Sequence, residues 1–181
     1  MRKSQNHKLH ITNHYSIFAI IQLMNIPFHK PTLPNDLNLL FPKTIRSGWL
    51  TTGPQVKEFE SKLAEYLNSE HVVAVNSCTA ALHLALASKN FKKGDKFVAP
   101  TYTFIASVEV GEYLGMEPVL IDSAINGFNL DLNQVENKLK NDNRIKAIIP
   151  VHFAGQAVEM NRIFDLADHY NLFVLEDAAH A

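Results

Sequence analysis

The residues best suited to chemistry lie in the stretch LFVLEDAAHA, from Leu172 to Ala181. Four apolar residues lead into Glu176 and Asp177, and two alanines then lead to His180. A run this short and apolar predicts a parallel strand buried on both faces, with Asp177 and His180 just past its carboxyl end. Ligands of open α/β sheets bind at that edge. Asp177 could accept a hydrogen bond from a protonated ring nitrogen or cap a following helix, and His180 could stack on a ring or serve a structural role.

Two further predicted strand ends carry residues that could bind a ligand. In NSCTAA, the backbone N–H groups of Thr79 and Ala80 fall in the first turn of a predicted helix, where a phosphate would be favoured. Alternatively, Ser77 or Thr79 merely caps that helix. Phe104, in TYTFIAS, could cover one face of a planar ligand or belong to the core. We interpret Cys78 as a small space-filling residue rather than a nucleophile, because no positioned base accompanies it.

Strands and helices that could position these residues alternate along the chain. Five short apolar runs predict strands at 71–76, 95–100, 118–122, 145–152 and 172–176. Helices are predicted at 37–45, from Pro54 onward, at 77–88, up to about 114, after 131 and at 161–170. Asp131 and Gln134 resemble a capping box. This alternation indicates right-handed βαβ crossovers and a mainly parallel sheet.

Residues 1–25 differ in composition from the rest of the chain. They contain three histidines and the apolar run Ser16 to Met24. A secretory signal is disfavoured because Gln22 interrupts the run and no small-residue cleavage site follows. A metal site is disfavoured because nothing nearby gives the histidines a rigid frame. We therefore interpret 1–25 as an unstructured extension, or as a misread start with Met24 as the true one, and 26–181 as the domain.

Composition excludes several classes of partner. The chain has 181 residues, 46% of them hydrophobic, and a formal net charge of -1. Lys and Arg are scattered rather than gathered in a stripe, which argues against nucleic-acid binding. No apolar run is long enough to predict a membrane span. The single cysteine, Cys78, excludes an internal disulfide and predicts a cytoplasmic protein, and we expect no metal site.

Five stretches taken together resemble the DegT/DnrJ/EryC1/StrS family of sugar aminotransferases, which use pyridoxal 5'-phosphate in the fold of aspartate aminotransferase. They are SGWLTTGPQVKEFE, AVNSCTAALHLAL, APTYTFIAS, AIIPVHFAGQ and VLEDAAHA, in family order and at family spacing. The resemblance covers 26–181, roughly the first half of a family-length chain. It implies an α/β fold, the three-layer, mainly parallel sheet of the type I large domain, truncated before completion.

The resemblance also implies a role for each candidate residue. The backbone of Thr79 and Ala80 would hold the cofactor phosphate, and Phe104 would stack on the pyridine ring. Asp177 would pair with the ring nitrogen and keep it protonated, so that the ring can accept electrons. His180 stands where the family has Gln or His beside the ring. The sequence departs from the family at Cys78, where Gly or Ala is usual.

The implied reaction moves an amino group from a donor such as glutamate to a nucleotide-linked keto sugar, in the biosynthesis of polysaccharide or another glycan, by a homodimer. The family's Schiff-base lysine follows the EDAA motif, and no lysine of this sequence stands in a matching context, so we assign no catalytic residue. Two alternatives stay open. One is an inactive fragment or pseudoenzyme that associates with a complete subunit, and the other is a dehydratase of the same fold. We further expect two strands absent from the sequence to separate 72–76 from 145–152, leaving bare sheet edges beside both.

Overall fold

The computed structural model describes residues 30–181, so the predictions about residues 1–25 and about a domain start at Ile26 lie outside the described residues. The chain divides into two compact units, Met1–Asn68 and Ser69–Ala181.

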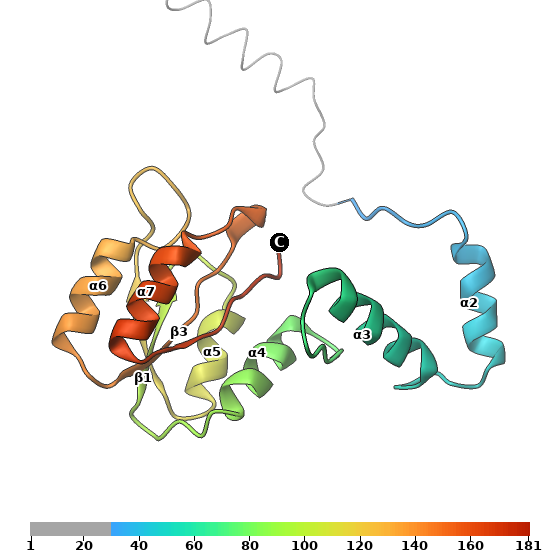
Figure 1. Ribbon diagram of the computed structural model, residues 1–181, viewed down its shortest axis with the longest axis horizontal. Coiled ribbons are helices and arrows are strands. Elements are labelled where there is room, and N and C mark those ends of the chain that lie inside the picture. Colours follow the sequence, from blue (N-terminus) through green and yellow to red (C-terminus); the bar gives the residue numbers. More distant parts are fainter. Residues whose placement is uncertain (1–29) are drawn as a thin grey trace, which may run out of the picture. The chain divides into compact units, whose positions relative to one another are not determined.

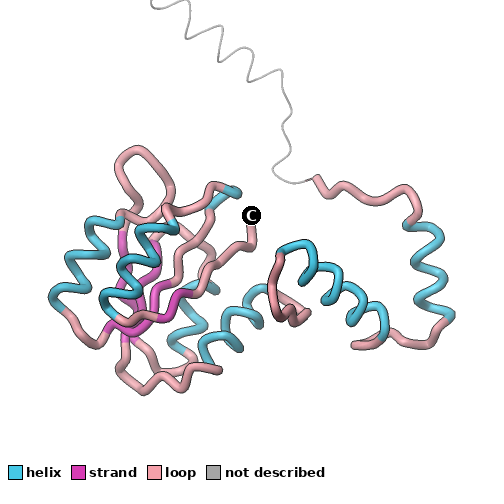
Figure 2. Tube along the Cα trace, in the orientation of Figure 1, coloured by secondary structure: helices cyan, strands magenta, loops and turns pink. Residues whose placement is uncertain are grey.

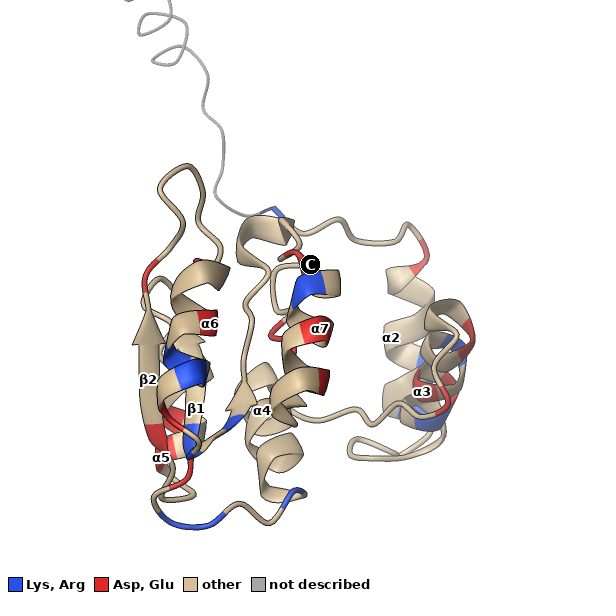
Figure 3. Ribbon diagram, turned by 60° about the vertical axis from the view of Figure 1, so that its left-hand side comes forward, with Lys and Arg blue, Asp and Glu red and all other residues tan. Residues whose placement is uncertain are grey.

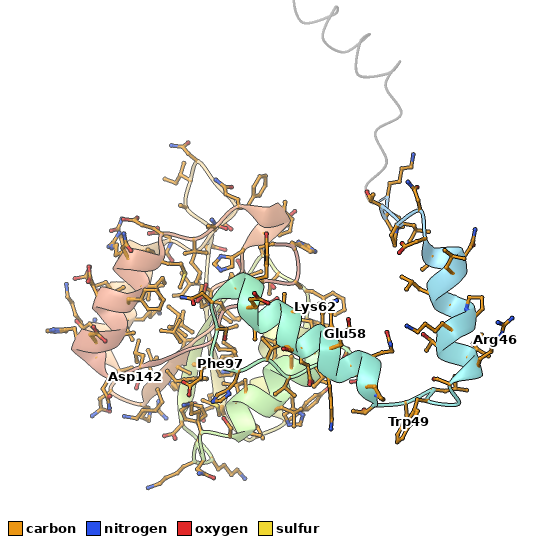
Figure 4. All side chains as sticks on the ribbon, turned by 45° about the vertical axis from the view of Figure 1, so that its right-hand side comes forward. Arg46, Trp49, Glu58, Lys62, Phe97 and Asp142 are labelled. Atoms are coloured by element: carbon orange, nitrogen blue, oxygen red, sulfur yellow. The ribbon has the colours of Figure 1, made fainter. Side chains whose placement is uncertain are left out.

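The described part of the first unit consists of two helices, α2 (Leu37–Arg46) and α3 (Pro54–Leu67), joined by a loop (Figure 1). Both agree with the predicted positions. Pro54 opens α3 because its fixed φ suits the first helical position and its missing N–H has no acceptor there. Neither helix contains a buried residue. On the exposed surface of α3, Glu58 and Lys62 lie one turn apart and pair at 2.6 Å (Figure 4).

The second unit is built on a four-stranded parallel sheet in the order β2-β1-β3-β4, which confirms the predicted α/β class (Figures 1 and 2). Its elements, in chain order, are α4 (Cys78–Ala87), β1 (Lys96–Pro100), α5 (Ala106–Glu112), β2 (Glu117–Ile121), α6 (Leu132–Asn141), β3 (Ile145–Ile148), the 3₁₀ turn η1 (Phe153–Gly155), α7 (Met160–Tyr170) and β4 (Phe173–Val174).

Each face of the sheet is covered by a pair of helices. Phe97 and Ala99 of β1 face one core, which they share with Leu82 and Leu86 of α4 and with α5. Val98 points the opposite way, because side chains alternate along a strand, and packs with residues of α6 and α7. Phe97 lies inside the packed side chains in Figure 4. The result is the expected three-layer arrangement, with β1 and β3 as its central strands.

Three details of the sheet differ from prediction. Residues 71–76 form no strand, although they are rich in valine, because no described strand lies beside them to pair their backbone groups. β3 and β4 are shorter than predicted. The expectation of a bare sheet edge beside residues 145–152 is wrong, because β3 lies between β1 and β4. Isolated bonds extend this last pairing, with the N–H of Asp177 donating to Pro150 and that of His152 donating to Asp177.

The start of α6 forms one of the two hydrogen bonds of the predicted capping box. Asp131 accepts hydrogen bonds from the N–H groups of Asn133, at 2.9 Å, and Gln134, at 3.4 Å. The side chain of Gln134 does not return to the N–H of Asp131, because that group already donates to the carbonyl of Asp122. It donates instead to the second carboxylate oxygen of Asp131, at 3.0 Å. Asp131 therefore caps the helix, but the second hydrogen bond is not the one that a capping box has.

At the amino ends of the strands, charged residues form a small network. The Lys96 Nζ atom lies 2.7 Å from Asp142 Oδ2, and both side chains are largely shielded from solvent. Arg144 lies 3.4 Å from Asp142, and Glu117 lies 3.9 Å from Lys96. Elsewhere, acidic and basic residues occur together on α3 and on α6 (Figure 3). This network stabilises the amino end of β1, which is the end that lies away from Asp177.

Candidate active site

The carboxylate of Asp177 is the best-fixed polar group at the carboxyl ends of the strands. The residue is 5% exposed. Its Oδ2 atom accepts a hydrogen bond from Ser107 Oγ at 2.7 Å, and its Oδ1 atom accepts one from the N–H of Ala179 at 3.2 Å. Its backbone bridges to Val151, which follows β3. Because both side chain and backbone are held, Asp177 presents an acceptor in a defined orientation.

The N-terminus of α4 lies directly beside this carboxylate. Cys78 Sγ is 3.8 Å from Asp177 Oδ1, although the two residues are 99 positions apart in the chain. Burial raises the pKa of the Cys78 thiol, and the neighbouring Asp177 carboxylate raises it further through its charge and its hydrogen bond. A thiol with a raised pKa is a poor nucleophile. The geometry therefore agrees with interpreting Cys78 as a space-filling residue.

Ser77 caps α4 from an extended backbone conformation. Its Oγ atom accepts a hydrogen bond from the N–H of Ala80 at 3.1 Å. The amide of Ala80, one of the two proposed phosphate ligands, is thus already paired with a side chain. The N–H of Thr79 lies in the same first turn, where a helix supplies no acceptor for it. An anion seated here would bind Thr79 directly and would compete with the Ser77 hydroxyl for Ala80.

Phe104 stands between the end of β1 and the start of α5, with 74% of its surface exposed. Its carbonyl oxygen lies 3.2 Å from Ser107 Oγ, the same hydroxyl that contacts Asp177. The backbone of Phe104 is therefore close to the carboxylate. A large exposed ring at this edge of the sheet is free to lie against a planar ligand.

His180 is held by the loop that follows β3. Its Nδ1 atom accepts a hydrogen bond from the N–H of Ala154 at 3.3 Å, and its ring lies edge-on to Phe153 with centroids 5.7 Å apart. Ala154 has a φ of 52°, an unusual conformation for a residue with a side chain. Because Nδ1 accepts, the neutral ring carries its proton on Nε2. The structure thus holds the ring of His180 against the turn η1, through Ala154 and Phe153.

Two groups of residues at this edge were missed by sequence reasoning. Ser107, fully buried, could have been noticed as the one hydroxyl in α5, near the start of that helix. The second group is aromatic. Tyr102 lies 4.6 Å from Phe153 and 5.7 Å from Phe128, as measured between ring centroids. Three segments far apart in the sequence supply these rings, so no sequence spacing could have joined them.

A cavity of about 330 Å³ lies elsewhere, between the loop before α6 and the start of α7. Its lining includes Asn129, Asp131, Val158 and Arg162, and none of the five predicted residues. The Asn129 Oδ1 atom is buried without a hydrogen-bond partner among the described residues. Arg162 is engaged with Asn133 at 2.8 Å. We therefore place the candidate site at Asp177, where the side chains of Ser107 and Cys78 contact a buried carboxylate, and not at this cavity.

Within residues 30–181, no three His, Cys, Asp or Glu residues are grouped so that they could ligate a metal. The same part of the chain has no helix with the length and apolar character needed to cross a bilayer.

Ligands of open α/β sheets bind at the carboxyl ends of the strands, where this fold places a buried acid beside a helix N-terminus. The sequence matches the model of the DegT/DnrJ/EryC1/StrS aminotransferase family over residues 32–181, and the chain belongs to this family. Members of the family use pyridoxal 5'-phosphate, and the fold is that of the type I enzymes.

Individual relatives agree with this assignment. The chain is 40% identical over 156 residues to the spore coat polysaccharide biosynthesis protein SpsC of Bacillus subtilis, covering 86% of this chain and 40% of SpsC. It is 33% identical over 156 residues to the UDP-4-amino-4-deoxy-L-arabinose–oxoglutarate aminotransferase of Shewanella sediminis, covering 86% of this chain and 40% of that protein. Spr1654 of Streptococcus pneumoniae, solved in its PMP form, superposes with a TM-score of 0.78 at 32% identity, covering 87% of this chain and 43% of Spr1654. The chain thus spans about 40% of the length of the curated relatives it matches.

Proposed function

We propose that this chain supplies the cofactor-binding edge of a pyridoxal-phosphate-dependent aminotransferase that acts on a nucleotide-linked keto sugar. The observation that carries the proposal is the buried Asp177 carboxylate, held by Ser107 and lying 3.8 Å from the first residue of α4. An acid and a helix N-terminus so close together match the two ends of a phosphorylated pyridine, one cationic and one anionic.

The residues present fit such a cofactor. An ionised carboxylate can accept about four hydrogen bonds, and Asp177 receives bonds from Ser107, Ala179 and, weakly, Cys78. One acceptor direction therefore remains for a ring N–H. The amide of Thr79 and the positive end of the α4 dipole suit a phosphate. The exposed ring of Phe104 would lie against the pyridine face, and His180 would stand beside its edge.

Each of these residues would make a distinct contribution. Pyridoxal phosphate, when bound, supplies an electron-accepting ring that stabilises the charge left when a proton leaves the substrate carbon. Asp177 would keep the ring nitrogen protonated, which maintains that capacity, and burial strengthens its hydrogen bond. Thr79 and Ala80 would anchor the phosphate, and Phe104 would orient the ring by stacking. We assign no lysine of this chain to Schiff-base formation.

The substrate part of the proposal is supported by the family and by the relatives' names. We propose a keto sugar carried on a nucleotide as amino acceptor and glutamate as donor, within polysaccharide biosynthesis, and a homodimer as the working assembly. The relative from Shewanella sediminis is named for a UDP-linked amino sugar and oxoglutarate, the keto form of glutamate. The single cysteine suits a reducing compartment, so we place the reaction in the cytoplasm as part of this proposal.

The direct test is to titrate the purified chain with pyridoxamine 5'-phosphate and follow its absorbance and fluorescence. The amine form is preferred because, unlike the aldehyde, it forms no Schiff bases with surface lysines. Asp177→Asn should weaken binding by about tenfold to a hundredfold, since a hydrogen bond to a charged group contributes roughly 1.5–3 kcal/mol. Asp165→Asn, which changes an exposed carboxylate on α7, should leave affinity unchanged.

Saturable binding that Asp177→Asn weakens and Asp165→Asn does not would support the proposal. Absence of binding by the unmodified chain, or equal binding by the chain and Asp177→Asn, would overturn it. The amino acceptor is tested separately. A chain carrying bound pyridoxamine phosphate is mixed with nucleotide-linked keto sugars and with free keto sugars, and only the linked ones should change the absorbance of the bound amine.

A further inference from the structure

Ser107 is a fully buried hydroxyl whose contacts lead to the candidate acid. Its Oγ atom lies 2.7 Å from Asp177 Oδ2, across 70 positions of sequence. It also lies 2.7 Å from Thr103 Oγ1 and 3.2 Å from the carbonyl of Phe104. Three polar partners around one buried hydroxyl make up a small network on the side of α5 that faces Asp177.

The direction of the hydrogen bonds follows from counting protons. A serine hydroxyl has one proton, and an ionised carboxylate can only accept. The short contact to the charged Asp177 oxygen is stronger than the longer one to the neutral Phe104 carbonyl, so the Ser107 proton points to Asp177. Thr103 then donates to Ser107. A chain of donors in this order strengthens each bond in turn.

We propose that Ser107 is a positioning residue, whose hydroxyl, oriented by Thr103, holds the Asp177 carboxylate in the orientation needed to meet the cofactor's ring nitrogen. The inference rests on the proposed function and adds a residue to it. The carboxylate is clamped at both oxygens, by Ser107 at Oδ2 and by the Ala179 N–H at Oδ1. Without Ser107, Oδ2 loses its donor and the carboxylate is held through Oδ1 alone.

A purely structural role does not explain why residue 107 carries a hydroxyl. Its side of α5 includes Ala106 and Val110, both buried, in a helix that packs against Phe97. A hydroxyl in an apolar environment is costly unless it is hydrogen-bonded, and alanine would fill the same space at no such cost. The N-cap of α5 is Ile105, so Ser107 is not the residue that begins the helix.

The chain contains its own probe of the carboxylate. Cys78 is the only cysteine in the sequence, and its Sγ atom lies 3.8 Å from Asp177 Oδ1. Asp177 raises the pKa of this thiol, after the larger effect of burial. The rate at which iodoacetamide alkylates Cys78, measured across pH, therefore reports on where the carboxylate lies, with no cofactor present.

Four variants are compared by this pH profile and by affinity for pyridoxamine 5'-phosphate. Asp177→Asn should move the thiol profile to lower pH, because a negative charge is lost. Ser107→Ala should move it part of the way, since the released carboxylate spends less time beside the thiol, and should weaken binding by about twofold to tenfold. Ser107→Thr keeps the hydroxyl and should restore both readouts. Val110→Ala loosens α5 without touching the carboxylate and should change neither.

The outcomes separate the inference from the proposed function. If the unmodified chain binds and Asp177→Asn weakens binding, but Ser107→Ala changes neither the profile nor the affinity, the inference fails and the function stands. A changed profile with unchanged affinity, or an equal effect of Val110→Ala, also overturns it. If the unmodified chain does not bind at all, the proposed function fails and the inference fails with it, whatever the profile. Matching shifts in both readouts, rescued by Ser107→Thr, establish the role.

Discussion

The Nδ1 atom of His152 accepts a hydrogen bond from the backbone N–H of Val158 at 3.1 Å. Because Nδ1 accepts, the neutral ring carries its proton on Nε2, which lies 2.9 Å from Glu176 Oε2 and can donate to it. His152 is 6% exposed. One buried side chain therefore ties the loop after β3 to the residue before Asp177.

Replacing His152 should show how much this loop depends on a single acceptor. His152→Leu leaves the Val158 N–H buried and unpaired, which should cost about 1–3 kcal/mol in the free energy of unfolding. His152→Asn keeps an oxygen near the position of Nδ1 and should cost less, although asparagine is more polar than leucine. Urea unfolding of the three proteins measures the difference. Leucine and asparagine variants of equal stability would show that the bond contributes little.

The cap of α4 should contribute measurably to stability. Ser77→Ala removes the acceptor of the Ala80 N–H and should lower the free energy of unfolding by about 1 kcal/mol. Ser88→Ala, at the other end of the helix, removes a hydroxyl that bonds only to an exposed carbonyl and serves as the control. Chemical denaturation provides the measurement, and an equal loss in both variants would contradict the assignment of Ser77 as the cap.

Gly111 should tolerate no side chain, because of space rather than backbone conformation. A Cβ atom built on Gly111 would overlap the ring of Phe97, which is fully buried. Gly111→Ala should therefore cost about 1–3 kcal/mol through overpacking. At Gly127 a Cβ atom would meet nothing within 4 Å, so Gly127→Ala should be nearly neutral. Adding Phe97→Leu to Gly111→Ala should recover part of the loss, and failure of this double variant to recover any would argue against the clash.

Acid should weaken the second unit partly through Asp142. The side chain of Lys96 hydrogen-bonds this carboxyl and, with a backbone bond from Arg144, lowers its pKa from 3.8 to about 2. A lowered pKa stabilises the folded chain above the unfolded value, and that stabilisation is lost as the pH falls from about 4 to about 2.

Asp142→Asn should accordingly lower the melting temperature at pH 6, and the difference from the unmodified chain should shrink towards zero near pH 2. Thermal unfolding followed by circular dichroism at several pH values tests this. Asp165→Asn, an exposed change, should show no such pH-dependent difference. A gap that stays constant from pH 6 to pH 2 would exclude the ion pair as its cause.

Much of the fold could be predicted because its signals are local. In the second unit, the apolar runs predicted the four strands β1 to β4, and the helical patterns predicted its helices. Asp131 and Pro54 correctly marked the starts of α6 and α3. The predicted strand at 71–76 failed because a valine-rich run specifies a tendency to pair but supplies no partner. The neighbour of β3 was also mispredicted, since strand order depends on which connections cross the sheet.

The candidate site could likewise be predicted from the sequence only in part. Asp177 and the start of α4 could be named from the sequence, because strand ends and helix starts have recognisable residues. Ser107 could not be linked to Asp177, since their contact joins residues 70 positions apart. The pairing of the Ala80 amide with Ser77 depends on a side-chain rotamer, which no sequence pattern specifies.

The side chains of Phe97 and Val98 face opposite sides of the sheet, and this affects how the second unit responds to mutation. Leu86 belongs to the core on the Phe97 side of the sheet, and Leu139 belongs to the core on the Val98 side. With a layer of backbone between them, the two cores share no cavity into which either can relax. The energetic effects of Leu86→Ala and Leu139→Ala should therefore add to within about 0.5 kcal/mol in the double variant. Each side of the sheet can accumulate substitutions without altering what the other tolerates.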